Sequence, residues 1–437
     1  MSSYKTKKTP GDTTWFTHDR FGLFIHWGLY ALPARHEWIK NMERIPEEKY
    51  QKYFERFNPD LYDPMEWAQK AKAAGMKYAV FTSKHHEGFC MWDTKVSDYK
   101  CTNTPAGCDL VKEYTDAFRA CGLKVGFYYS LIDWHHPDFT IDRLHPRRDD
   151  ENAAQLNEGR DMKRYAKYMR DQVTELLTNY GKIDILWFDF SYPDSPGDKW
   201  PKGKGKADWE SEELIKTARG IQPNLIIDNR ADIEQDLWTP EQYQPQTWLK
   251  HDETGELLTW EACQTFSGSW GYHRDESTWK SPEMLIRMLI NTVSLGGNLL
   301  MNVGPTARGY LDARAVGALD VYANWMKYNS RSIYGCTMAE PDLLPSLPPD
   351  CRFTQSADKK RLYLHMFAWP FAHIHLPGLG GKVAYIQFLH DDSELKFTEG
   401  EVRHFGEGLP KEEKLLVIEL PIIKPDILVP VIELILH

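Results

Sequence analysis

The segment Ile183-Asp-Ile-Leu-Trp-Phe-Asp189-Phe190 is a nearly continuous run of bulky apolar residues that closes on an acid. A strand with one solvated face would alternate apolar and polar residues, whereas this run is typical of a parallel strand covered on both faces. Similar runs recur on either side of it. We expect six further strands: Phe21–Trp27, Lys77–Ser83, Lys124–Ser130, Asn224–Asn229, a weaker Thr259–Gln264, and Asn298–Val303.

Stretches with helical periodicity separate these strands. They are Asp63–Ala74, Asp109–Ala120, Gln155–Asn179, Ser211–Arg219, Pro282–Val293 and Ala313–Tyr328. Seven strand–helix repeats between Phe21 and Ser330 predict a (β/α)8-like barrel in which one strand is unassigned. A doubly wound open sheet is the main alternative. The G-x-G-x-x-G and Walker loops that would support that alternative do not follow the first strand.

The chain changes character after Ser330, where the helical periodicity stops. The apolar runs there are short, several of them alternate, and Gly, Pro and charged turns separate them: Arg361–Met366, Val383–Leu389, Leu415–Leu420 and Ile427–Leu436. This pattern predicts a small antiparallel β-sandwich. The Pro-rich bridge Pro341-Asp-Leu-Leu-Pro-Ser-Leu-Pro-Pro349 marks a boundary, so we expect the barrel over residues 1–340 and the sandwich over 341–437.

Composition excludes several functions for the 437 residues. The net charge of −10 with neutral histidines provides no basic field for nucleic acid or an anionic membrane. The one basic cluster, Lys202-Gly-Lys204-Gly-Lys206, is expected to be a flexible loop. The seven cysteines are an odd number without a C-x-x-C pair, which argues against a disulfide framework and a zinc–thiolate site.

The sequence also bears on location. No uninterrupted apolar stretch reaches the ~20 residues of a membrane-spanning helix. The start, Met1-Ser-Ser-Tyr-Lys-Thr-Lys-Lys8, is basic, but the hydrophobic segment of a secretion signal does not follow it. We therefore expect a cytoplasmic protein without a membrane partner, or a secreted one if a signal has been removed.

Polar residues stand at the ends of five successive predicted strands. They are His26, the pair His85-His86, the pair Tyr128-Tyr129, Asp189 and Arg230. In a parallel α/β barrel the carboxyl ends of the strands form one rim, where reactive groups gather. A single buried polar residue is usually a satisfied hydrogen-bond partner. Five such endings at one rim indicate a functional site.

Asp189 is the most informative of these residues. It lies between Phe188 and Phe190, where an acid is costly to desolvate without partners. Arg230 on the neighbouring strand could pair with it and hold it ionised. An ionised carboxylate on a rigid strand suits a covalent nucleophile or a metal ligand. The alternative is an Asp–Arg pair that only joins two strands.

The pair His85-His86 raises the question of a metal. Neighbouring residues on an extended strand face opposite ways, so both rings could hold one ion only if the strand has broken into a loop. A neutral imidazole offers one donor and one acceptor, which suits sugar hydroxyls. We therefore favour hydroxyl binding over metal binding at these positions.

A second carboxyl group would be needed beside Asp189. Glu241, in the predicted exposed turn 239–242, and Glu261, in Trp260-Glu261, are the candidates. Each alone is typical of a solvated surface acid. Because Asp189 needs a second carboxyl group beside it, we keep both glutamates as candidates for that role.

Seven segments, in this order along residues 14–340, resemble glycoside hydrolase family 29, the α-L-fucosidases. They are Phe21-Gly-Leu-Phe-Ile-His-Trp-Gly28, Glu37-Trp38, Thr82-Ser-Lys-His-His-Glu-Gly-Phe89, Leu186-Trp-Phe-Asp189, Trp260-Glu261, Ser269-Trp-Gly-Tyr272 and Asn298-Leu-Leu-Met-Asn-Val-Gly-Pro305. Several long matches in order make the resemblance specific. The C-terminal β-rich part also fits the layout of the family.

The resemblance implies a retaining double displacement that releases terminal α-L-fucose. Asp189 matches the nucleophile, and Glu241, ahead of Glu261, is the expected acid/base. The implied sugar-binding residues are His26, Glu37, Trp38, His85, His86, Tyr128, Trp187, Arg230 and Trp270. Such a mechanism requires divergent pKa values, so we expect a low pKa for Asp189 beside Arg230 and a raised one for the glutamic acid.

The resemblance further implies a fucosylated oligosaccharide or glycoconjugate as substrate and neither a metal nor an organic cofactor. It is compatible with homo-oligomers, for which the β-rich end offers an interface. Two alternatives stay open. One is a metal-dependent barrel hydrolase that uses His26, His85, His86 and Asp189 as ligands. The other is a carbohydrate-binding protein that has lost catalysis, although Asp189 and the candidate acids argue against it.

Overall fold

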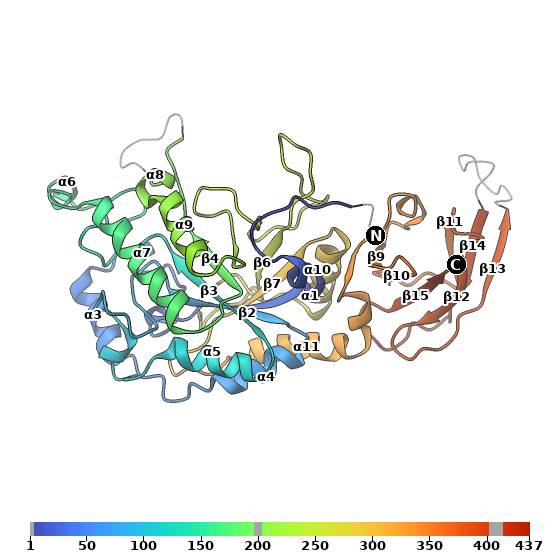
Figure 1. The fold of residues 1–437 in the computed structure, drawn as a ribbon. Helices are drawn as coiled ribbons and strands as arrows, with labels where there is room; N and C mark the ends of the chain where they lie inside the picture. Colours follow the sequence, from blue (N-terminus) through green and yellow to red (C-terminus); the bar gives the residue numbers. More distant parts are fainter. Residues whose placement is uncertain (1–3, 196–202, 402–413) are drawn as a thin grey trace.

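The computed structural model describes residues 4–195, 203–401 and 414–437 (Figure 1). Seven parallel strands form one curled sheet in the order β5-β4-β3-β2-β1-β7-β6. Their bounds are β1 (Phe21–Ile25), β2 (Tyr78–Lys84), β3 (Lys124–Ser130), β4 (Ile185–Asp189), β5 (Ile226–Ile227), β6 (Glu261–Thr265) and β7 (Asn298–Val303). Each lies in or overlaps a predicted strand, so the barrel of parallel strands is confirmed.

The segment 237–241 fills the gap between β5 and β6. Parallel bridges join Leu237 to Asp228 on one side, and join Trp238 to Trp260 and Glu241 to Cys263 on the other. The segment therefore occupies the eighth barrel position. The expectation of an exposed turn at 239–242 is wrong for Thr239 and Pro240, which are buried, whereas Glu241 and Gln242 are exposed. Proline at position 240 has no backbone N–H to donate, so the pairing is interrupted there.

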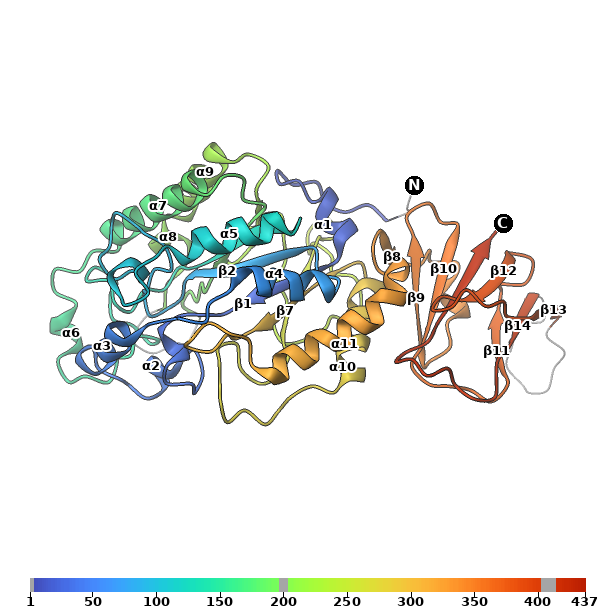
Figure 2. The same ribbon diagram turned by 90° about the horizontal axis from the view of Figure 1, so that it is seen from below.

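Helices cover the outside of the sheet, and Figure 2 shows α4, α5 and α11 lying across β1, β2 and β7. The helices that match predicted ones are α4 (Pro64–Ala73), α5 (Leu110–Ala120), α7 (Met162–Asn179), α9 (Ser211–Ile221), α10 (Pro282–Ser294) and α11 (Ala313–Asn329). The shorter ones are α1 (Thr14–Asp19), α2 (Ile39–Met42), α3 (Glu47–Arg56), α6 (Ala153–Leu156) and α8 (Lys206–Trp209).

The predicted helix 155–179 is in fact two helices, α6 and α7. Gly159 adopts a left-handed φ of 82° between them, which ends the first helical stretch. Asp161 then caps α7, because its side chain accepts a hydrogen bond from the backbone N–H of Lys163 at 2.8 Å.

Two antiparallel sheets follow the barrel, with strand orders β12-β15-β10-β9-β8 and β11-β14-β13. Their bounds are β8 (Cys336–Met338), β9 (Cys351–Ser356), β10 (Arg361–Met366), β11 (His373–Pro377), β12 (Val383–Phe388), β13 (Phe397–Glu401), β14 (Lys414–Glu419) and β15 (Val431–Leu436). Leu364 of the larger sheet and Leu416 of the smaller belong to one buried core, so the expected sandwich is confirmed. β8 precedes residue 341, so the larger sheet begins within the range expected for the barrel.

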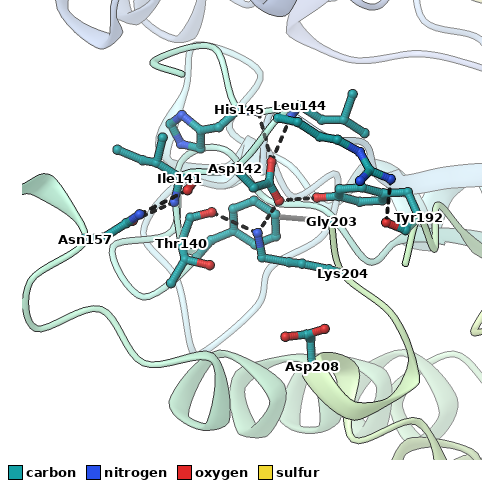
Figure 3. Close-up of polar contacts among 12 residues, drawn as sticks. Thr140, Ile141, Asp142, Leu144, His145, Asn157, Tyr192, Gly203, Lys204 and Asp208 are labelled. Carbon is teal, nitrogen blue, oxygen red and sulfur yellow. Dashed lines mark hydrogen bonds and ion pairs between the residues drawn. The ribbon is translucent and has the colours of Figure 1, made fainter. Parts of the chain in front are cut away.

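The basic cluster expected to be a flexible loop is firmly anchored where the structure describes it; Lys202 lies outside the described residues. Lys204 is only 3% exposed, and its Nζ forms an ion pair with Asp142 and donates to the carbonyl oxygen of Thr140 at 2.9 Å (Figure 3). The Tyr192 hydroxyl donates to the same Asp142 carboxylate at 2.5 Å. The expectation of a loose loop is therefore wrong at Lys204.

No helix in the described part of the chain has the length and apolar character needed to span a bilayer.

Candidate active site

A cavity lies at the carboxyl ends of the barrel strands. Its lining residues are Phe24, His26, Glu37, Trp38, His85, His86, Tyr128, Trp187, Asp189, Phe190, Arg230, Glu241, Cys263 and Trp270. Every predicted site residue except Glu261 is among them. The alternation of strand residues explains much of this set, because residues two apart on a strand share a face. Phe24 and His26 face the interior from β1 and its end, and Trp187 and Asp189 do so from β4.

Asp189 ends β4 and is held by two donors. Its Oδ2 accepts a hydrogen bond from the Tyr128 hydroxyl at 2.7 Å, and its Oδ1 accepts one from Arg230 Nη1 at 2.9 Å. The neighbouring Tyr129 points to the helical side of β3, where its hydroxyl donates to Gln172 at 2.8 Å. Tyr128 is therefore the tyrosine that faces the site.

The charge balance of Asp189 differs from the prediction. Burial raises its pKa to about 6, although Arg230 and the Tyr128 hydroxyl lower it and the nearby Glu241 raises it. The expectation of a low pKa is wrong, because the cost of desolvating the carboxylate outweighs the attraction to Arg230.

Arg230 brings the two acids of the rim together. Its Nη1 lies 2.9 Å from Asp189 Oδ1 and 2.7 Å from Glu241 Oε2. The guanidinium is fixed elsewhere as well: Nε donates to Thr239 Oγ1 at 2.8 Å, and the group lies 4.4 Å from the centre of the Trp187 ring. The two carboxylate oxygens are thus no farther apart than the sum of the two distances to Nη1. This upper limit is compatible with the ~5–5.5 Å separation typical of retaining glycosidases.

The two candidate glutamates occupy different environments. Glu241 lines the cavity, with 41% of its side chain exposed. Glu261 begins β6, at the opposite end of that strand from the rim, and is fully buried. It accepts a hydrogen bond from the Tyr78 hydroxyl, and burial raises its pKa to about 7. Only Glu241 can contact a ligand in the cavity without rearrangement.

Hydrogen bonds define the tautomers of His26 and His86. His26 Nδ1 lies 2.6 Å from Asn302 Oδ1, an amide oxygen that can only accept, so Nδ1 carries the proton. His86 Nδ1 lies 2.7 Å from Ser130 Oγ, whose own proton is donated to the Ile132 carbonyl oxygen. Each ring therefore has an unprotonated Nε2. Burial lowers the pKa of His26 to about 3 and that of His86 well below its ordinary value, so both are neutral.

His85 and His86 face the same cavity because β2 ends one residue earlier, at Lys84. The buried Lys84 Nζ lies 3.3 Å from Asp133 Oδ2. The backbone N–H of Trp134 donates to the His86 carbonyl oxygen at 2.8 Å. These contacts tie the broken end of β2 to the loop after β3. The His85 and His86 rings lie 4.1 Å apart, and His85 Nδ1 is buried without a hydrogen-bond partner in the described structure.

The residues proposed for a metal-dependent hydrolase do not assemble as ligands. Across residues 4–195, 203–401 and 414–437, no group of three or more His, Cys, Asp or Glu side chains has an arrangement suited to a metal ion.

Glu37, Trp38 and Trp270 lie outside the barrel strands and complete the walls of the cavity. The Gly271 N–H donates to Glu37 Oε2 at 2.8 Å, which joins the loop after β1 to the loop after β6. Asn302 Nδ2 donates to the Trp270 carbonyl oxygen at 2.6 Å. Trp38 packs edge-on to His86, with ring centres 4.8 Å apart. Carboxylate, imidazole and indole groups therefore surround one small space.

Sequence reasoning missed three lining residues: Phe24, Phe190 and Cys263. Phe24 could have been found, because it is two residues before His26 on the same strand face. Cys263 likewise follows Glu261 by two. Phe190 carried no such signal, because its left-handed φ of 81° redirects its side chain after β4 has ended.

The chain is similar to known proteins over most of its length. A family model described as alpha-L-fucosidase matches residues 2–331. The plasma alpha-L-fucosidase of Homo sapiens is 29% identical over 93% of this chain and 85% of its own length. The alpha-L-fucosidase of Dictyostelium discoideum is 28% identical over 82% of this chain and 78% of its own.

Solved structures agree with this similarity. Alpha-L-fucosidase isoenzyme 1 from Paenibacillus thiaminolyticus is 46% identical, with 97% of this chain and 98% of that chain covered and a TM-score of 0.87. The Thermotoga maritima alpha-fucosidase is 27% identical, with 96% of each chain covered and a TM-score of 0.76.

Proposed function

Because the chain belongs to the alpha-L-fucosidase family of glycoside hydrolases, we propose that it releases terminal α-L-fucosyl residues by a retaining double displacement in which Asp189 is the nucleophile and Glu241 the acid/base. The contact of both carboxylates with one nitrogen of Arg230 supports this assignment most directly. The Thermotoga maritima relative has been solved with fucose and with a mechanism-based inhibitor, which supports a fucosyl group as the substrate.

The reaction would proceed in two steps. Glu241 donates a proton in the first step and accepts one in the second. A carboxylate oxygen of Asp189 attacks C1 of the fucosyl ring while the bond from C1 to the leaving oxygen breaks and Glu241 gives that oxygen its proton. Glu241, now ionised, then takes a proton from water. The water oxygen bonds to C1, and the bond from C1 to Asp189 breaks. Arg230 keeps both carboxylates in place throughout.

The remaining lining residues suit a six-deoxy sugar. The unprotonated Nε2 atoms of His26 and His86 can accept hydrogen bonds from ring hydroxyls, as can the Glu37 carboxylate. Phe24 and Trp270, whose ring centres lie 5.9 Å apart, provide an apolar wall for the C6 methyl group. These contacts would orient the sugar with C1 toward Asp189.

Two measurements test this proposal. NMR of the product first formed from 4-nitrophenyl α-L-fucoside is expected to show α-L-fucose, whereas β-L-fucose would exclude a double displacement. Inactivation with 2-deoxy-2-fluoro-L-fucosyl fluoride followed by peptide mapping is expected to label Asp189. A label on another residue would overturn the assignment of the nucleophile.

The pKa of Asp189 predicts the acidic side of the pH profile. The nucleophile must be ionised, so the acidic limb of kcat/KM is expected to fall as the pH drops through about 6. The positive charge of Arg230 lowers the pKa of Asp189, so Arg230→Gln should move this limb to higher pH. Arg230→Lys, which keeps the charge, should move it less. A wild-type limb near the ordinary ~3.9 of an aspartic acid would contradict the prediction.

A further inference from the structure

A second hollow adjoins the sugar cavity on the far side of Glu241. It shares Phe190, Arg230 and Glu241 with that cavity and adds Asn229 and Asp232 to its lining. Its volume of about 420 Å³ falls within the range of small-molecule sites. Glu241 therefore lies where the two spaces meet.

The position of Glu241 indicates what the second hollow receives. An acid/base must reach the oxygen that links the sugar to its leaving group. With the fucosyl ring beside Asp189, that oxygen lies near Glu241, and the leaving group extends into the second hollow. This step rests on the proposed function.

The charge of the hollow is set by Asp232. Its side chain is exposed and makes no ion pair with any residue in the described part of the chain. Arg230 is the only cationic side chain among the described lining residues, and it already contacts Asp189 and Glu241. Glu241 must be protonated when the leaving group departs. Among the described lining residues, Asp232 therefore supplies the one standing negative charge that faces the leaving group.

The surrounding backbone holds Asp232 in place. Its own φ of 59° is left-handed, and its Oδ2 accepts a hydrogen bond from the Lys206 N–H at 3.0 Å. Any Cβ at Gly205 would come within 2.8 Å of the same oxygen, so a glycine permits this close approach. The buried ion pair between Lys204 and Asp142 anchors this segment one residue earlier (Figure 3).

We propose that Asp232 is a specificity residue that excludes negatively charged leaving groups, so that the second hollow takes neutral, hydroxyl-rich saccharides. Within the described residues the Asn229 side-chain amide accepts one long hydrogen bond, from Thr239 at 3.5 Å, and it can bind a saccharide hydroxyl. Two like charges ~4 Å apart in water repel enough to lower binding about fivefold. A carboxylated or sulfated saccharide would meet this repulsion, and a neutral one would not.

Two matched fucosides isolate the effect of charge. The probes are 4-carboxyphenyl α-L-fucoside and its methyl ester, which differ little in size. The readout is the ratio of kcat/KM for the ester to kcat/KM for the acid, in wild type and in Asp232→Asn. Removing the charge is expected to lower this ratio about fivefold, and Asp232→Ser should lower it similarly. Screening predicts that added salt lowers the ratio in the wild type as well.

Asp116→Asn is the control, because it removes the same charge from an exposed position on α5, where 62% of the side chain is exposed. It is expected to leave the ratio unchanged. An unchanged ratio in both Asp232 variants, or a wild-type ratio insensitive to salt, would overturn the inference. Failure of the proposed function looks different, because the wild type would then hydrolyse neither fucoside.

Discussion

Asp189→Ala is expected to lower kcat on 4-nitrophenyl α-L-fucoside by ~10⁴-fold or more while the protein stays folded. The substitution removes the group that would bond to C1. In the proposed mechanism the other two carboxylates of the cavity have different roles, Glu241 at the leaving group and Glu37 at the ring hydroxyls, so neither replaces it. The fold should survive, since burial raises the pKa of Asp189 to about 6 and keeping this side chain ionised at neutral pH opposes folding. Steady-state kinetics and a melting curve at pH 8 measure both effects.

Azide gives this prediction a second readout. In Asp189→Ala, azide can occupy the space of the lost carboxylate and attack C1 from the same side, which yields the β-L-fucosyl azide. The matched control is Asp184→Asn, which changes a buried acid near the other end of β4. Asp184 accepts a hydrogen bond from the Val125 N–H at 3.0 Å, so its loss should lower the melting temperature and leave turnover within a few-fold. Near wild-type turnover by Asp189→Ala would exclude its role as nucleophile.

Local sequence patterns predicted most of the barrel, because its strands are apolar on both faces. The bounds of β3 and β7 match the predicted ones, and Asp189 follows directly from the run that forms β4. The eighth barrel position could not be predicted in the same way. The segment 237–241 contains Pro240 and polar residues, and it is held by single bridges to strands on either side rather than by its own pattern.

The candidate site was predicted more completely than its electrostatics. Residue type and strand position suffice to place Asp189 and Arg230 at one rim. The sign of the pKa shift of Asp189 depends on how much water the folded chain removes from it, which no local pattern contains. The choice between Glu241 and Glu261 likewise depends on the folded chain and not on the local sequence. Glu261 shares an inward strand face with Cys263 but lies at the wrong end of β6.

Glu241→Ala is expected to have the second largest effect, and that effect should depend on the leaving group. For methyl α-L-fucoside, whose leaving group needs a proton, kcat/KM should fall by ~10²–10⁴-fold. For 2,4-dinitrophenyl α-L-fucoside the first step should be nearly unaffected, because the leaving group departs as an anion. Hydrolysis of the glycosyl-enzyme then becomes slow, since no base activates the water. Steady-state kinetics with both substrates measures the difference.

Azide distinguishes this variant from Asp189→Ala. In Glu241→Ala the azide attacks the glycosyl-enzyme and needs no base, so turnover of the dinitrophenyl substrate should rise and the product should be the α-L-fucosyl azide, the opposite anomer to that from Asp189→Ala. Glu261→Gln is the control, because it keeps the shape and the contact with Tyr78 but removes the acid. It should neither depend on the leaving group nor respond to azide. If Glu261→Gln shows both effects and Glu241→Ala neither, the acid/base is Glu261, and the contact between Glu241 and Arg230 serves only to position that arginine beside Asp189.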